Sequence, residues 1–255
     1  SKCVTHTITK SDTTTTLADQ SKTYNGSSQP ASGASSKLSS NNSAISNGSY
    51  TYTYYSGDSC AGTALTSAPK DAGTYSVKAT LAGTSNYNSS TSGCATLIIN
   101  KIANPMTFTT PQSGSVTFST SAQSKTFTGA ASAQGAVTYS IQSQKSGSTN
   151  VTYFSIPTNT TASISVAANT PAGTYTIVVR ASAAGNTNYN SKTLDMTYTL
   201  TVNRQGVAFP TCASKVYTGS SQTLFAAHSS GAYTNEAITG TNVDSYSKDL
   251  TPTDD

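Results

Sequence analysis

Two histidines and ten acidic residues are the side chains that could carry out acid–base or metal chemistry in this sequence. His228 has no Ser or Cys context that resembles a nucleophile motif, and His6 lies in a segment that resembles the closing strand of a repeat. The carboxylates are scattered, without the Asp-x-Asp spacing of calcium loops or the ligand spacing of zinc sites. We therefore expect no catalytic residue, no cofactor and no bound metal, and structural or surface roles for both histidines.

The cysteines are the next reactive side chains. Cys60 and Cys94 lie in a segment that has a second copy about 100 residues later, and that copy lacks a cysteine at both matching places, as the joint loss of a disulfide would produce. A Cys60–Cys94 bridge is one interpretation, and two separate buried thiols are the other. Cys3 lies in surroundings like those of Cys94, and Cys212 has no counterpart. A disulfide would indicate an oxidising compartment.

Tyrosine rings could stack on a ligand or pack in a core. Tyr50, Tyr52 and Tyr54 alternate with threonines and share one face of a predicted strand, whereas Tyr55 points the opposite way. These four tyrosines are either an aromatic platform for a ligand or part of a half-buried sheet face. We favour packing.

Among longer segments, three motifs occur twice, in the same order and offset by roughly 100 residues, which is one β-sandwich domain. The pairs are Asp71-Ala-Gly-Thr-Tyr75 with Pro171-Ala-Gly-Thr-Tyr175, Thr84-Ser-Asn-Tyr87 with Asn186-Thr-Asn-Tyr189, and Leu97-Ile-Ile-Asn-Lys101 with Leu200-Thr-Val-Asn-Arg204. The chain is therefore predicted to contain repeated domains.

A fourth motif is interpreted as the start of each repeat. It occurs as Lys22-Thr-Tyr24-Asn-Gly26, Lys125-Thr-Phe127-Thr-Gly129 and Lys215-Val-Tyr217-Thr-Gly219. The third copy does not reach an Ala-Gly-Thr-Tyr segment, and the segment from Cys3 to Lys10 resembles the closing segment from Cys94 to Lys101. The predicted organisation is the closing strand of a preceding repeat at 1–10, repeat one at 11–101, repeat two at 102–204, and a partial repeat three at 205–255.

Alternation of apolar and polar residues predicts strands throughout, with Gly, Asn, Ser and Pro in the gaps. Val137, Tyr139 and Ile141 share a face, and further strands are predicted from Val151 to Ile156 and from Ala162 to Val166. No stretch has a helical period, so the predicted fold class is all-β.

The segment Ala72-Gly-Thr-Tyr75 resembles the tyrosine corner of immunoglobulin folds, in which a tyrosine hydrogen-bonds back to the chain. With Tyr24-Asn-Gly26, Ser85-Asn-Tyr87-Asn88 and Ile98-Ile-Asn-Lys101, the pattern resembles the bacterial immunoglobulin-like repeats of large surface proteins and adhesins. The resemblance implies tandem immunoglobulin-like β-sandwiches, with Tyr75 and Tyr175 as corner residues, in a surface or secreted protein. The cysteine–tryptophan–cysteine pin of antibody domains is missing, because the chain has no tryptophan.

Composition narrows the function further. Only 9% of the residues are charged, and the net charge of +4 is not gathered into a basic run, so we expect no nucleic-acid partner. No apolar run approaches the length of a membrane span. The regular strands argue against a mucin-like Ser/Thr stalk.

We therefore predict a non-enzymatic spacer segment of a bacterial cell-surface adhesin or extracellular fibre. The alternative is a glycan- or protein-binding module of an adhesin. The expected partners are neighbouring repeats, host glycan or protein, and other copies of the chain, since few charges guard the sheet edges. A strand from another chain could also complete the partial repeat.

Overall fold

The computed structural model describes residues 4–206, 214–226, 233–234, 237–247 and 251–252. These residues form strands, bridges, turns and loops and include no helix, so no membrane-spanning helix is found among them. The prediction of an all-β fold is confirmed. The chain divides into two compact units, one of residues 1–107, 130–137 and 182–194, the other of residues 108–129, 138–181 and 195–255.

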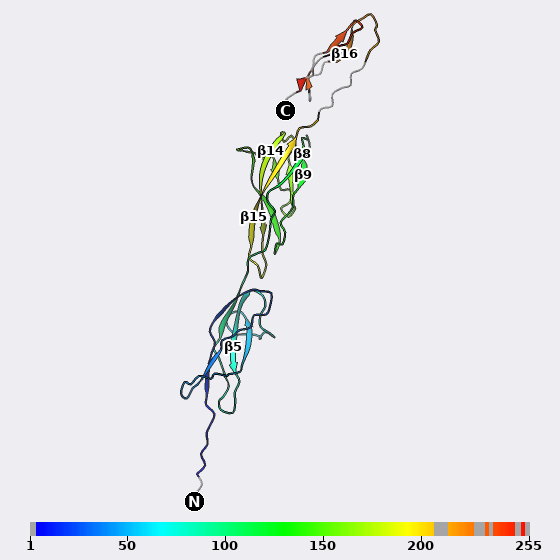
Figure 1. Ribbon diagram of the computed structural model, residues 1–255. Helices are drawn as coiled ribbons and strands as arrows, with labels where there is room; N and C mark the ends of the chain where they lie inside the picture. The colour runs from blue at the N-terminus through cyan, green and yellow to red at the C-terminus, as the bar shows by residue number, and fades with distance from the viewer. Residues whose placement is uncertain (1–3, 207–213, 227–232, 235–236, 248–250, 253–255) are drawn as a thin grey trace. The chain divides into compact units, whose positions relative to one another are not determined.

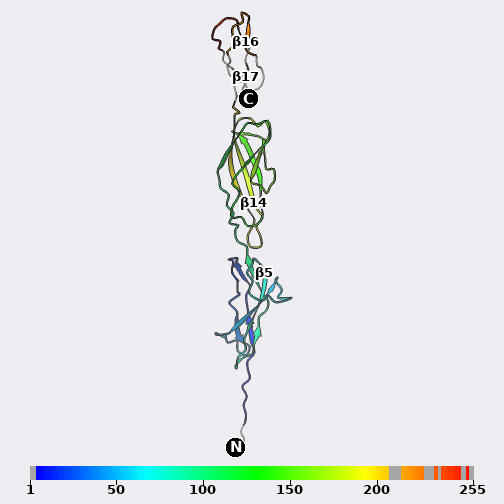
Figure 2. The same cartoon turned by 90° about the vertical axis from the view of Figure 1, so that its right-hand side faces the viewer.

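The first immunoglobulin-like β-sandwich, which includes the strand labelled β5 in Figures 1 and 2, has one larger and one smaller sheet. The larger sheet has the order β2-β7-β5-β4, with β6 also pairing with β5, and the smaller sheet pairs β1 with β3. The strands are β1 (Thr13–Thr16), β2 (Gln20–Thr23), β3 (Ser35–Leu38), β4 (Tyr50–Ser56), β5 (Gly73–Leu81), β6 (Ser90–Thr91) and β7 (Ala95–Asn100). β2 runs parallel to β7, while the other pairs are antiparallel.

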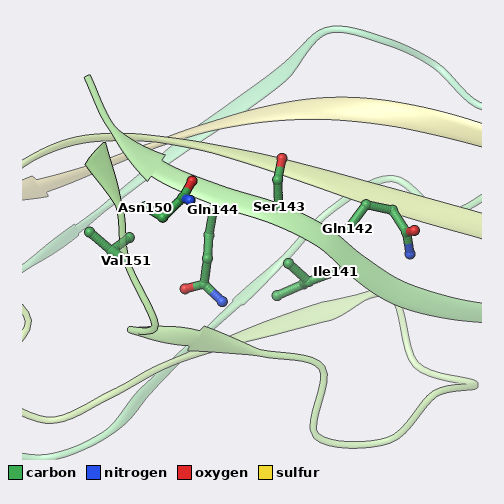
Figure 3. Close-up of a pocket in the computed structure, with 6 residues that line it drawn as sticks. All are labelled: Ile141, Gln142, Ser143, Gln144, Asn150 and Val151. Carbon is green, nitrogen blue, oxygen red and sulfur yellow. The ribbon is translucent and has the colours of Figure 1, made fainter. Parts of the chain in front are cut away.

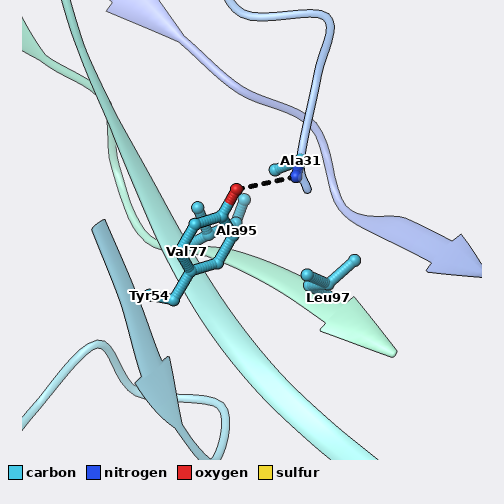
Figure 4. Packing of buried hydrophobic residues seen from close by; sticks show 5 residues of the cluster. All are labelled: Ala31, Tyr54, Val77, Ala95 and Leu97. Atoms are coloured by element: carbon cyan, nitrogen blue, oxygen red, sulfur yellow. Dashed lines mark hydrogen bonds between the residues drawn. The ribbon is translucent and has the colours of Figure 1, made fainter. Parts of the chain in front are cut away.

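Strand alternation explains the core of this sandwich. Every second residue is buried from Val77 to Leu81 of β5 and along β7, so the apolar side chains of these strands face the other sheet. The central cluster is Ala31, Tyr54, Val77, Ala95 and Leu97, and Figure 4 shows the Tyr54 ring lying against Val77 and Ala95. Ile98, on the opposite face of β7, is exposed.

The second sandwich has a five-stranded sheet of order β11-β10-β14-β15-β8 and a three-stranded sheet of order β12-β13-β9. Its strands are β8 (Gln112–Thr117), β9 (Gln123–Thr126), β10 (Val137–Ser146), β11 (Thr149–Asn150), β12 (Phe154–Ser155), β13 (Ser163–Val166), β14 (Gly173–Ala183) and β15 (Lys192–Asn203). Its aromatic core includes Phe108, Phe127, Tyr139 and Tyr198. The strand expected from Val151 to Ile156 is reduced to β12.

Towards the C-terminus, β16 (Gln222–Phe225) pairs with β18 (Ile238–Gly240), and β17 (Tyr233–Thr234) pairs with β19 (Thr251–Pro252). Both pairs are antiparallel. At the other end, residues 4–10 lie outside any strand, and their assignment to a preceding repeat stays a prediction.

The first two copies of the start motif lie early in their sandwiches but do not form equivalent strands. Gln20–Thr23 and Gln123–Thr126 have the same four letters, but the first is β2, parallel to β7, and the second is β9, antiparallel to β13 in the other sheet. The counterpart of β2 in the second sandwich is β8, which pairs in parallel with β15. Both tetrapeptides show the same alternation of half-buried and exposed residues, a pattern that suits an edge of either sheet.

Candidate functional site

A disulfide joins Cys60 and Cys94, with Cα atoms 5.8 Å apart and a sequence separation of 34, so this prediction is confirmed. Cys60 lies in the connection between β4 and β5, which contains no strand, whereas the corresponding connection of the second sandwich contains β11, β12 and β13. Cys94 directly precedes β7. The bridge therefore fastens a connection that has no strand of its own to the closing strand.

Tyr75 and Tyr175 make the same local hydrogen bond. The Tyr75 hydroxyl donates to the Asp71 carbonyl at 3.1 Å, and the Tyr175 hydroxyl donates to the Pro171 carbonyl at 2.7 Å, each four residues upstream. Burial raises the pKa of Tyr75, helped by the charge of Asp71, and burial raises the pKa of Tyr175, helped by Tyr153. Both hydroxyls therefore keep the proton that they donate. The geometry matches the hydrogen bond expected of a tyrosine corner.

The four tyrosines of β4 do not form an exposed platform. Tyr54 is only 6% exposed, and its hydroxyl oxygen accepts a hydrogen bond from the Ala31 N–H at 2.8 Å (Figure 4). Tyr52 packs against the same core cluster, and Tyr50 and Tyr55 are half-buried. The ligand-platform interpretation is wrong for Tyr54, because its ring lies beneath the sheet surface and its oxygen is already hydrogen-bonded.

The second sandwich has a polar groove that the sequence did not indicate. A groove of about 330 Å³ lies along β10 and β11, lined by Ile141, Gln142, Ser143, Gln144, Asn150 and Val151 (Figure 3). The Gln144 amide is already used, because it donates to the Phe154 carbonyl at 2.9 Å and accepts from the Phe154 N–H at 2.8 Å. The Gln142 amide nitrogen donates to the Ser140 hydroxyl oxygen at 2.8 Å, which leaves its carbonyl oxygen and its second N–H. These groups, the Asn150 amide and the Ser143 hydroxyl can hydrogen-bond a polar ligand. The lining contains no ionisable group, so it offers no acid or base.

Among the described residues, no group of three His, Cys, Asp or Glu side chains could hold a metal ion. Arg180 and Asp195 form a two-point ion pair at 2.7 and 2.8 Å on the surface of β14 and β15. The hydrogen bond from Arg180 lowers the pKa of the Asp195 carboxyl. Three further residues with reactive side chains, Cys3, Cys212 and His228, lie outside the described residues.

Asn188 makes side-chain hydrogen bonds to two residues far away in the sequence, which the sequence did not indicate. Its amide oxygen accepts from the Ala72 N–H at 2.7 Å, and its amide nitrogen donates to an Asp71 carboxylate oxygen at 3.0 Å. All three residues belong to the first compact unit. The motifs that contain these residues were recognisable as repeats, but nothing in their spacing indicated that one motif touches the other.

No protein-family model and no curated protein matches this chain. Among solved structures, Drosophila N-cadherin EC1-4 is 12% identical, with a TM-score of 0.35 over 76% of this chain and 50% of that one. Human protocadherin-24 EC1-2 is 15% identical, with a TM-score of 0.33 over 74% of this chain and 96% of that one. A SusE-like surface-located polysaccharide-binding protein of Bacteroides thetaiotaomicron is 13% identical, with a TM-score of 0.28 over 74% and 34%.

The chain thus spans half the length of the N-cadherin structure. At these identities and TM-scores, the similarities give no information about what this chain binds.

Proposed function

We propose that the chain is a non-enzymatic spacer segment of a bacterial cell-surface adhesin or extracellular fibre, built from immunoglobulin-like repeats at 11–101 and 102–204 with part of another at 205–255. Its partners in this role are neighbouring repeats and, through unpaired sheet edges, other copies of the chain. The Cys60–Cys94 disulfide supports an extracellular location, because such bonds persist in oxidising compartments.

The observation that carries this proposal is the parallel pairing of an early strand with the closing strand of the larger sheet in each sandwich. Four residues of β2 pair in parallel with β7, from Gln20 opposite Leu97 to Thr23 opposite Asn100. Six residues of β8 pair in parallel with β15. A parallel partner lets the chain enter a sandwich at one end and leave at the other.

Tension applied through the chain therefore slides these two strands along each other. All the hydrogen bonds between them then carry load together, whereas strands peeled from one end would break them one at a time. Further backbone bonds extend both ladders, from the Tyr24 N–H to the Asn100 carbonyl at 2.9 Å and from the Phe118 N–H to the Asn203 carbonyl at 2.8 Å. This arrangement suits a spacer that holds under force.

Pulling single molecules of the full chain tests the role. Because Phe118 donates to β15, alternation along β8 places the Val116 N–H in the same ladder and the Ser115 N–H on the opposite side. We expect Val116→Pro to lower the unfolding force of the second sandwich and the matched control Ser115→Pro to lower it much less. An unmodified second sandwich that unfolds no more strongly than the Val116→Pro variant would refute the spacer proposal.

A second candidate is binding of host glycan or protein, and the groove along β10 and β11 is the observation that favours it. Gln142 and Asn150 present amides there, in a setting where hydrogen bonds can fix the orientation of a polar ligand. The test is a glycan array with the full chain and its Gln142→Ala and Asn150→Ala variants, with Tyr55→Phe as the control. Binding that survives both groove substitutions would exclude this site.

A further inference from the structure

Asn188 binds two neighbouring residues, Asp71 and Ala72, in the tyrosine-corner segment that leads into β5. With its amide it contacts the Ala72 N–H and the Asp71 carboxylate at once. The surroundings strengthen the contact, since the Lys101 ammonium donates to the Asn186 carbonyl at 2.9 Å and the Tyr189 ring lies edge-on to Tyr24 at a centroid distance of 5.9 Å.

The loop that presents Asn188 has a close counterpart earlier in the chain. The Asn186 N–H donates to the Tyr189 carbonyl at 3.1 Å, and the Thr84 N–H donates to the Tyr87 carbonyl at 3.0 Å. In both loops the next asparagine N–H is capped by a side-chain oxygen, from Asn186 in one and Thr84 in the other. Asn86 therefore occupies the backbone position of Asn188.

The segment that precedes each sandwich docks on its loop in the same way. Ile102 pairs in parallel with Tyr189, and Ser11 pairs in parallel with Tyr87. The Ile102 N–H donates to the Asn188 carbonyl at 3.0 Å, and the Ser11 N–H donates to the Asn86 carbonyl at 3.0 Å. Lys10 directly precedes Ser11 as Lys101 precedes Ile102. The backbone pairing, the lysine before it and the tyrosine that follows the asparagine thus recur around Asn86, with Thr84 in the place of Asn186.

The two asparagine side chains differ in what they contact. Asn188 is half-buried against the corner, whereas Asn86 is exposed, and its side-chain amide has no hydrogen-bond partner within the described residues. At the same backbone position, the Asn188 amide thus binds the corner at Asp71 and Ala72, whereas the Asn86 amide binds no corner among the described residues.

We propose that the loop of residues 84–88 is a docking site for the Asp-Ala-Gly-Thr-Tyr corner of another immunoglobulin-like repeat, joined to the chain through Lys10. Asn86 accepts from the backbone N–H of that repeat's alanine and donates to its aspartate, as Asn188 does with Ala72 and Asp71. The Lys10 ammonium donates to the Thr84 carbonyl, and Tyr87 packs against the counterpart of Tyr24. This corner is the proposed ligand of the loop because Asn188 already binds the corner at Asp71 and Ala72 within this chain.

This proposal concerns recognition between repeats, so it stands or falls separately from the pulling test of the spacer role. The first measurement uses the full chain as it is. Amide hydrogen exchange at Ala72, followed by NMR, is expected to accelerate about fivefold to tenfold in Asn188→Ala, because the N–H loses its acceptor. Unchanged exchange would remove the contact from which the proposal is drawn.

The second measurement uses the full chain extended by a copy of residues 11–101, placed directly before Ser11. Asn86→Ala, made in the original copy alone, is expected to accelerate amide exchange at Ala72 of the added copy by a similar factor and to leave exchange at Ala72 of the original copy unchanged. Asn188→Ala is expected to accelerate exchange at Ala72 of the original copy and to leave Ala72 of the added copy unchanged. Protection at Val77 in both copies shows that each is folded. Equal exchange at the added Ala72 with and without Asn86→Ala would overturn the proposal.

A different occupant would also be detected. If Asn86→Ala changes the sedimentation of the unextended chain, the loop binds a second molecule, and the proposed linked repeat is wrong. If the variant loses binding on the glycan array, the loop binds sugar, and the proposal is likewise overturned.

Discussion

Reducing the Cys60–Cys94 disulfide is expected to change how far the first sandwich extends when it unfolds under tension. The bridge closes a loop with a sequence separation of 34, and force does not stretch residues inside a closed loop. An extended chain gains at most about 3.3–3.6 Å per residue, so opening this loop adds roughly 110 Å to the length released by unfolding.

The assay is single-molecule force spectroscopy of the full chain with and without a reducing agent, and with Cys60→Ser as a second way of opening the loop. One unfolding step should lengthen by the full increment in both cases. The step of the second sandwich should not change, because that sandwich has no cysteine in the described residues. A first-sandwich step of equal length in oxidised and reduced chains would refute the reasoning, since it would mean that the loop is not closed by this bond.

The remaining predictions concern stability. On the chain-entropy model, loss of the same bridge lowers the free energy of unfolding by about 3–4 kcal/mol, measured by chemical denaturation of Cys60→Ser; no change would indicate that the reduced loop is already ordered. Tyr175→Phe removes the donor to the Pro171 carbonyl and should cost about 1 kcal/mol in the same assay, and an unchanged midpoint would show that water replaces it. A Cβ at Gly114 would clash with the Tyr198 hydroxyl oxygen, so Gly114→Ala should destabilise by about 1–3 kcal/mol. Tyr198→Phe should relieve much of that loss, because it removes a buried hydroxyl that has no hydrogen-bond partner among the described residues; additive effects of the two substitutions would contradict the clash. The lowered pKa of Asp195 means that its pairing with Arg180 stabilises the fold above the ordinary carboxyl pKa and is lost as the pH falls through the lowered value; NMR titration of Asp195 at or above its usual pKa would exclude the pair.

Alternation and repetition were sufficient to predict the all-β class, the Cys60–Cys94 bridge and several of the strands, although the strand expected from Val151 to Ile156 is reduced to β12. The bridge could be inferred because the second copy lacks both cysteines together, which is evidence about a pair of residues. Tyr54 was harder, because alternation places three tyrosines on one face but does not show how deep each lies.

Other features depend on three-dimensional proximity and had no signal in the sequence. The shared letters of β2 and β9 could not show which sheet each strand joins, because a short two-faced strand suits either one. The contact of Asn188 with Asp71 joins residues 117 positions apart, and no local pattern marks it. The groove along β10 depends on where β11 ends, and strand ends are the least predictable part of a sequence.

The parallel pairing of β2 with β7 and of β8 with β15 also has an evolutionary consequence. A unit that the polypeptide traverses in a single direction can be duplicated or deleted in the gene without reversing the polarity of the domains downstream. Unequal recombination between similar coding segments would therefore alter copy number while leaving the flanking parts of the protein in their original sense. Such a gene could change the reach of its product in single steps of one domain.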